Sequence, residues 1–140
     1  MDKKYSLYKC LIPVRWGDMD AIGHVNNTVY FRYMEQARVE WIELVGFGVG
    51  SRDETAVIVN ASCTFLRPIT YPATVEITMF AGVAGRSSLP TAYELRVAGE
   101  ERVYAEGAAK IVWMDARTGK SVPLPEKLRG VLQSCQTERS

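Results

Sequence analysis

Hydrophobic and polar positions between Asn26 and Gly46 follow a helical repeat. Projected at about 100° per residue, the apolar and aromatic side chains form one stripe, and the charged side chains gather on the opposite face. A short side-chain oxygen from Asn26, Asn27 or Thr28 is suited to cap the start, and Gly46 together with Gly48 is suited to end the helix. The pattern predicts one long helix that needs a large apolar surface to lie against. Its stripe consists of Tyr30, Tyr33, Met34, Ala37, Trp41, Leu44 and Val45.

Elsewhere the apolar positions alternate with a period of two, which is typical of β-strands. Prolines punctuate the segment 67–72 and Gly99 marks a hairpin, so turns separate the successive runs. Four consecutive runs after the helix predict an antiparallel meander with the helix laid across its concave face. Pro13 restricts the far end of the first run to an edge of the sheet. The predicted strands lie at 7–16, 57–65, 75–83, 93–97 and 102–114, the fourth opening at 85–88, with a short terminal helix at 123–132.

The same periodicities predict which side chains face together. On the helix, Glu35 and Arg38 are three residues apart and are expected to form a surface ion pair. In the first strand after the helix, alternate residues are expected on one face of the sheet. These are Val57, Val59, Ala61, Cys63 and Phe65.

Composition sets the class of protein. With 140 residues, 47% of them apolar and 24% charged, the chain is expected to be one soluble α+β domain spanning 1–140. A net charge of +1 without a Lys/Arg run argues against nucleic acid as a partner, and the apolar runs are too short to cross a membrane. Cys10, Cys63 and Cys135 lack any C-x-x-C spacing, so free thiols are expected. With no leader-like segment at the N-terminus, this predicts a cytoplasmic protein.

Catalytic motifs narrow the chemistry mainly by their absence. The sequence has one histidine, His24, and no G-x-S-x-G elbow, metal-ligand cluster, Walker A loop or dinucleotide fingerprint, so neither a metal nor a cofactor is expected. What remains is Asp18 and Asp20 in a turn directly before the helix. A D-x-D in a turn is more often an Asx-turn or a cap than a catalytic pair. The helix behind it is what makes this one a candidate.

A carboxylate beside a helix N-terminus suits thioester hydrolysis. Asp20 can attack the carbonyl or activate water for the attack, while backbone N–H groups at the helix start hold the developing oxyanion. The leaving thiol has a pKa of about 8.5, so its thiolate departs without a strong general acid. We expect Asp18 to be structural, pairing with Arg15. For His24 two roles stay open, holding the turn and contacting the substrate.

The segment D-M-D-A-I-G-H-V-N-N-T-V-Y at 18–30, followed by the strands, resembles the 4-hydroxybenzoyl-CoA thioesterase-like branch of the hotdog-fold thioesterases. The resemblance implies a long helix wrapped by a five- or six-stranded antiparallel sheet, and hydrolysis of an acyl-CoA. It implies that Asp20 is the catalytic carboxylate, as nucleophile or general base. It implies that the backbone N–H of Asn27 polarises the carbonyl and that Gly23 allows the turn. A homodimer or homotetramer with the active site at the subunit boundary is also implied.

The resemblance extends to substrate-binding residues. At the start of the third strand after the helix, Arg86, Ser87 and Ser88 are implied to line the pantetheine arm or to meet a coenzyme A phosphate. Near the helix start, the substrate-binding residues are expected to be Gly23, Val25, Asn26 and Tyr30.

A second resemblance leaves the acyl carrier open. The H-V-N-N part is similar to the plant-type acyl-carrier-protein thioesterases, whose D-x-N-x-H pattern is matched here at Asp20 and His24, while Ile22 replaces the asparagine. Hydrolysis of acyl chains on acyl carrier protein is therefore one alternative. Non-catalytic binding of acyl-CoA is the other.

Overall fold

The long predicted helix forms as α1 (Asn27–Leu44) in the computed structural model, which describes residues 4–47 and 53–138. The side chain of Asn26 accepts a hydrogen bond from the Thr28 backbone N–H at 2.9 Å and so caps the start. Gly46 follows the end with a φ of +92°, a conformation that other residues rarely adopt. The predicted start and the stop at Gly46 are confirmed, whereas Gly48 lies outside the described residues.

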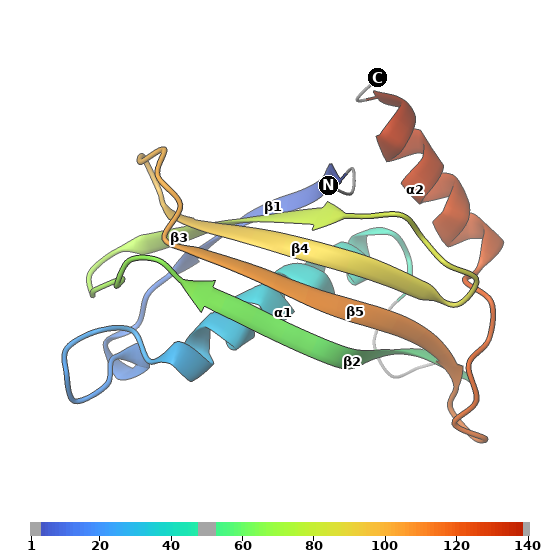
Figure 1. The fold of residues 1–140 in the computed structure, drawn as a ribbon, viewed down its shortest axis with the longest axis horizontal. Coiled ribbons are helices and arrows are strands. Elements are labelled where there is room, and N and C mark those ends of the chain that lie inside the picture. The colour runs from blue at the N-terminus through green and yellow to red at the C-terminus, as the bar shows by residue number, and fades with distance from the viewer. Residues whose placement is uncertain (1–3, 48–52, 139–140) are drawn as a thin grey trace.

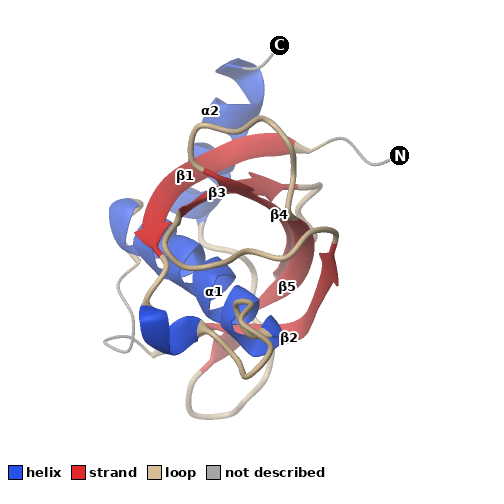
Figure 2. Cartoon of the chain, turned by 90° about the vertical axis from the view of Figure 1, so that its left-hand side faces the viewer, coloured by secondary structure: helices blue, strands red, loops and turns tan. Residues whose placement is uncertain are grey.

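Five antiparallel strands wrap around α1 (Figures 1 and 2), which confirms the predicted α+β architecture. In Figure 2 the sheet curves around the helix. Its inward side chains form one hydrophobic core with the apolar stripe of α1. A 3₁₀ turn precedes α1, and a second helix ends the chain. These elements are β1 (Tyr5–Pro13), η1 (Trp16–Asp18), β2 (Glu54–Phe65), β3 (Thr74–Ala81), β4 (Ser88–Val97), β5 (Ala105–Asp115) and α2 (Glu126–Glu138).

The order of the strands differs from the predicted meander. β2 pairs with β5 instead of β3, so the order across the sheet is β1–β3–β4–β5–β2. The link from β2 to β3 passes the start of α1, where the Val25 N–H donates to the Ile69 carbonyl at 2.8 Å. The N–H groups of Leu66 and Arg67 both donate to the Tyr104 carbonyl, at 2.9 and 3.0 Å. A hydrophobic period of two determines which face of the sheet a side chain lies on, but it does not determine which strand lies alongside. The predicted meander, in which β2 would pair with β3, was therefore wrong for β2.

A β-bulge also divides β2. The register shifts between Ile58 and Asn60, which adds one residue to this strand. Ile58 pairs with the fully buried Ile111 and faces inward, whereas Val57 faces outward. The common face predicted for β2 is therefore correct only from Ala61 onward.

The inner face of the sheet and the apolar stripe of α1 form one hydrophobic core. Tyr30, Met34 and Trp41 are each at most 2% exposed. Gly107 of β5 lets the helix approach closely, because a Cβ at this position would clash with the Met34 side chain. The core thus fixes how α1 lies against the strands.

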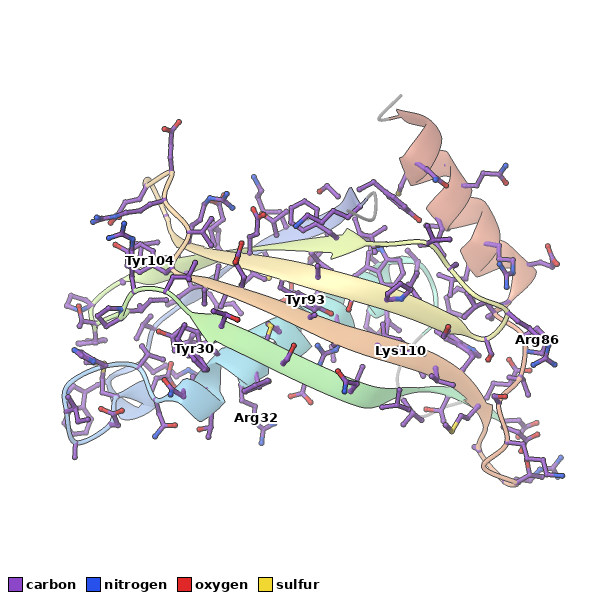
Figure 3. All side chains as sticks on the ribbon, viewed as in Figure 1. Tyr30, Arg32, Arg86, Tyr93, Tyr104 and Lys110 are labelled. Atoms are coloured by element: carbon purple, nitrogen blue, oxygen red, sulfur yellow. The ribbon has the colours of Figure 1, made fainter. Side chains whose placement is uncertain are left out.

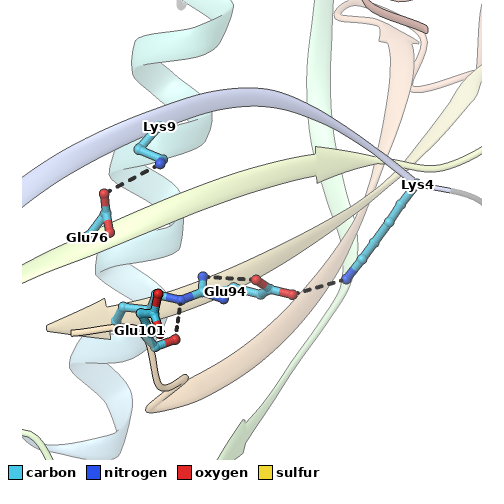
Figure 4. A network of polar contacts seen from close by, with 6 residues as sticks. Lys4, Lys9, Glu76, Glu94 and Glu101 are labelled. Carbon is cyan, nitrogen blue, oxygen red and sulfur yellow. Dashed lines mark hydrogen bonds and ion pairs between the residues drawn. The ribbon is translucent and has the colours of Figure 1, made fainter. Parts of the chain in front are cut away.

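Charged side chains form a network on the face of the sheet turned away from α1 (Figure 4). Glu94 forms ion pairs with Lys4 at 3.5 Å and with Arg96 at 2.9 Å, and Lys9 pairs with Glu76 at 3.5 Å. Partly exposed pairs of this kind add little stability each. Their main consequence is that the outer face is polar.

The polar face of α1 differs from the prediction in one pair. Glu35 pairs with Arg32 at 3.1 Å, and not with Arg38. Arg38 turns toward the sheet and donates to the Tyr93 hydroxyl at 3.3 Å. Tyr93 lies on β4, across the sheet from the exposed side of α1 that carries Arg32 (Figure 3). Arg38 lies four residues after Met34, next to the buried stripe, so its long side chain reaches inward.

The second helix, α2, lies at the end of the sheet where β3 turns into β4 (Figure 1). It begins three residues later than the predicted segment 123–132 and ends six residues past it. Leu124, Leu128 and Leu132 are buried, so this end of the chain packs through one apolar side. Within residues 4–47 and 53–138, no helix has the length and hydrophobicity needed to cross a membrane.

Candidate active site

A tight hairpin at residues 18–26 joins η1 to α1. The Asp20 N–H donates to the His24 carbonyl at 2.8 Å, and the Asn26 N–H donates to the Asp18 carbonyl at 2.9 Å. Asp20 thus lies opposite His24, Asp18 lies opposite Asn26, and the Met19–Val25 pair lies between these two pairs. The hairpin therefore sets the Asp20 acid close to the residue that caps α1.

Asp18 anchors the hairpin to the helix. Its Oδ2 accepts hydrogen bonds from the Tyr33 hydroxyl at 2.9 Å and from the Arg15 backbone N–H at 3.0 Å. Burial raises the pKa of the Tyr33 hydroxyl, and the bond to Asp18 raises it further, so the hydroxyl remains a donor at neutral pH. The sequence predicted Tyr33 only as a core residue, because no local signal identifies the partner of its hydroxyl.

One oxygen of the Asp20 carboxylate belongs to the turn. Oδ1 accepts from the Ile22 N–H at 2.9 Å and from the His24 N–H at 3.3 Å, an Asx-type arrangement. The other oxygen, Oδ2, has no hydrogen-bond partner in the described part of the chain, and the side chain is half-buried. The turn holds the carboxylate in place while Oδ2 stays open to a water molecule or a carbonyl carbon.

The start of α1 offers a backbone donor. The Thr28 N–H is bound by the Asn26 side chain, and the Val29 N–H by the Asn26 carbonyl, each at 2.9 Å. The Asn27 N–H has no acceptor within the helix, since it lies in the first turn, and none elsewhere in the described ranges. α1 has 18 residues, and its positive end strengthens this donor.

A fixed carboxylate and an unused N–H at one junction are the parts that acyl transfer to water needs. A cysteine nucleophile is a poor alternative. Cys63 of β2 is half-buried, and burial raises its pKa to about 11, so the thiol stays protonated at neutral pH. Within the described residues, Cys10, Cys63 and Cys135 form no disulfide, as the sequence predicted.

The other predicted residues of this region differ in exposure. Gly23 has a φ of +90°, which suits its expected part in the turn. His24 holds the turn through its backbone, and its ring makes no hydrogen bond with any described residue. Val25 and Tyr30 are each 2% exposed and belong to the core. Substrate contact by these four residues stays a prediction.

The second predicted group, Arg86, Ser87 and Ser88, lies at the other end of the sheet (Figure 3). It forms the turn between β3 and β4, whereas the hairpin follows Val14, whose N–H donates to the Ala73 carbonyl at the start of β3. β3 has eight residues, which at about 3.3 Å each separate the two groups by roughly 25 Å. Within one chain, Arg86 does not meet Asp20.

Comparison with known proteins adds a family to this geometry. Residues 14–132 match the family model of the thioesterase-like superfamily. The solved structure of the PA2801 protein from Pseudomonas aeruginosa, described as a thioesterase candidate, is 41% identical, with a TM-score of 0.88 over 91% of this chain and 98% of that chain. A gentisyl-coenzyme A thioesterase structure is 26% identical, with a TM-score of 0.78 over 86% and 98%. The long-chain acyl-CoA thioesterase FadM of Escherichia coli is 26% identical over 125 residues, 87% of this chain and 94% of its own.

Proposed function

Because this chain belongs to the thioesterase-like superfamily and is a thioester hydrolase, we propose that it cleaves acyl-CoA at the junction between the hairpin 18–26 and α1. Water and acyl-CoA give the free acid and coenzyme A. Asp20 attacks the thioester carbonyl or activates the water that does so. The oxyanion is held by the Asn27 N–H, and the thiolate leaves readily because its conjugate thiol, with a pKa of about 8.5, is far more acidic than an alcohol or an amine.

The observation that carries this proposal is the position of Asp20 in the hairpin that leads directly into α1. The Asx turn leaves one carboxylate oxygen open, and the cap at Asn26 leaves one first-turn N–H open. The open carboxylate oxygen of Asp20 is negative, whereas the open N–H lies at the positive end of α1, and the two segments adjoin in the chain. A carbonyl placed between them meets a nucleophile or base on one side and a hydrogen-bond donor on the other.

The names of the relatives indicate the thiol of the substrate, coenzyme A, more narrowly than its acyl group. The two relatives at 26% identity are named for different acyl groups, long-chain acyl in one and gentisyl in the other, and both names specify coenzyme A. We therefore propose an acyl-CoA in preference to an acyl chain on acyl carrier protein. The cytoplasmic location expected from the cysteine spacing and the N-terminal sequence stays a prediction.

Replacing Asp20 by asparagine tests the proposal. An asparagine oxygen can still accept the Ile22 N–H, so the turn is retained while the charge is lost. We expect kcat to fall about a thousandfold, equivalent to about 4 kcal/mol, on a panel of short, long and aromatic acyl-CoA esters followed by thiol release. Asp115→Asn is a matched control, because Asp115 Oδ1 also accepts two backbone N–H groups of its own turn, at 2.8 and 3.0 Å. Equal rates for wild type and Asp20→Asn on every ester would refute the role of Asp20.

We further propose that the active unit is a homodimer joined along β2. β2 is an edge strand of 12 residues whose one charged side chain is Glu54, so little protects this edge from pairing. On its inner face, Ile58 and Phe65 are 37% and 39% exposed. A two-fold axis pairs β2 antiparallel to its copy and swaps the ends of the sheet. The partner subunit's Arg86 then lies at the end that carries Asp20. A homotetramer built from two such dimers stays a prediction.

A lysine in the β2 edge tests the dimer. Val59 is 48% exposed at the bulge, and Val59→Lys places a charge where the two copies of β2 would pair. We expect a folded monomer by light scattering and a loss of kcat/KM of about a hundredfold or more. Leu11→Lys on β1, at the opposite edge and 61% exposed, should leave both unchanged. A wild-type monomer would refute the dimer, and a fully active Val59→Lys monomer would refute the shared site.

A further inference from the structure

Arg129 of α2 reaches the turn between β3 and β4 at residues 85–88. Its Nη2 donates to the Gly85 carbonyl at 2.7 Å and to the Arg86 carbonyl at 2.8 Å. The side chain is half-buried, and no carboxylate pairs with it in the described ranges of the chain. The positive charge of Arg129 is therefore used on two consecutive carbonyls of one turn.

Further bonds hold the same turn. The Leu124 N–H donates to the Arg86 carbonyl at 2.9 Å, and the Trp113 N–H of β5 donates to the Ser87 carbonyl at 2.8 Å. Within the turn, the Gly85 N–H donates to the Ser88 carbonyl at 2.8 Å. The backbone of 85–88 is thus fixed by β5 and by the segment that ends in α2, and not by its own sequence alone.

The side chain of Arg86 is the opposite case. It is exposed (labelled in Figure 3), and its guanidinium forms no hydrogen bond or ion pair with the described residues. A free guanidinium on a fixed backbone is suited to an anion with several oxygens, because little order is lost when the anion binds. The phosphates of coenzyme A are anions of this kind.

We propose that α2 is part of the substrate-binding apparatus, with Arg129 as a positioning residue that holds the 85–88 turn so that Arg86 meets a phosphate of coenzyme A. This inference rests on the proposed function. Arg129 touches no reacting atom and lies at the end of the sheet opposite the hairpin of the same chain. Without it, the turn loosens and Arg86 must be ordered at every binding event, which weakens binding of the nucleotide end but leaves the chemical step unchanged.

Two substrates with the same acyl group test the inference. One is an acyl-CoA, and the other is the acyl-pantetheine, which lacks the phosphates. For Arg129→Gln we expect the KM for acyl-CoA to rise about tenfold, equivalent to about 1.4 kcal/mol, with kcat and the acyl-pantetheine kinetics unchanged. Arg86→Gln should give the same signature. The double variant should lose no more than the larger single loss, because both changes remove one contact.

Controls address charge and folding. Arg32→Gln removes an exposed arginine of α1 and should leave both substrates unaffected. Arg129→Lys keeps the charge but not the geometry of the guanidinium, so its KM should lie between those of wild type and Arg129→Gln. Equal losses on acyl-CoA and acyl-pantetheine would mean that Arg129 only supports the fold, and would overturn the inference.

Titration of free coenzyme A by calorimetry separates this inference from hydrolysis. If wild type binds coenzyme A and Arg129→Gln weakens the binding about tenfold, the inference stands even when no ester is cleaved, and the proposed function alone fails. If Arg129→Gln binds coenzyme A as tightly as wild type, the inference is overturned while hydrolysis can still hold. If wild type does not bind coenzyme A, the inference is overturned as well.

Discussion

Replacing Asn26 by aspartate separates two properties of the start of α1. The Asn26 oxygen accepts hydrogen bonds from the Thr28 N–H at 2.9 Å and from the Thr28 hydroxyl at 2.7 Å. An aspartate oxygen can accept both, and its negative charge suits the positive end of the helix. The same charge would lie next to the oxyanion that we assign to the Asn27 N–H.

The size of the effect follows from the geometry. An oxyanion about 2.9 Å from the Asn27 nitrogen and a carboxylate about 2.9 Å from the next backbone nitrogen lie roughly 6 Å apart. With an effective dielectric constant of about 40, between the values for a protein surface and for water, two negative charges at this distance repel by about 1.4 kcal/mol. We expect kcat for Asn26→Asp to fall about tenfold, while the free energy of unfolding stays within about 0.5 kcal/mol of wild type.

Urea denaturation and thiol release on the same preparations measure both quantities. Asn26→Ala serves as the contrast, since it removes the cap and should cost about 1 kcal/mol of stability without adding a charge. A tenfold loss of kcat in Asn26→Asp at unchanged stability supports the oxyanion site. Unchanged kcat in Asn26→Asp would refute the reasoning, because a charge this close to the oxyanion cannot leave its formation unaffected.

Three further outcomes are expected. Gly107→Ala should lose about 1–3 kcal/mol in the free energy of unfolding from overpacking against Met34, and the same change should cost less in a Met34→Ala background; no loss in the wild-type background would contradict the close packing. The hydrogen bond to Glu40, together with burial and the negative charge of Glu40, raises the pKa of Tyr8 from 10.0 to about 12. The stability that the neutral Tyr8 hydroxyl contributes is therefore present below pH 10 and falls as the pH rises toward 12. Glu40→Gln should flatten that decline in urea midpoints, and an unchanged decline would exclude the pair as its cause. Gly23→Ala, forced to a φ of +90°, should cost about 1 kcal/mol and lower kcat by displacing the hairpin, and wild-type values of both would argue against the turn.

Features that depend on neighbours along the chain were predictable from the sequence. The bounds of α1 follow from its repeat, its cap at Asn26 and the glycine at 46, all of which act within a few residues. The turn before α1 was predictable for the same reason, since Asp20 and Gly23 form it through contacts within a few residues. The position of the acid before the helix therefore followed from the sequence alone.

Features that depend on distant segments were decided only by the tertiary structure. Alternation shows that β2 has two faces, but its position beside β5 depends on how the strands pack around α1. The bond from Tyr33 to Asp18 and the bonds from Arg129 to the 85–88 turn join segments 15 and about 44 residues apart, and such partners leave no periodic trace in a sequence. The separation of roughly 25 Å along β3 between Arg86 and Asp20 was also decided only by the tertiary structure. A sequence motif specifies residue types and their spacing along the chain, whereas the distance between two motifs depends on how the whole sheet packs.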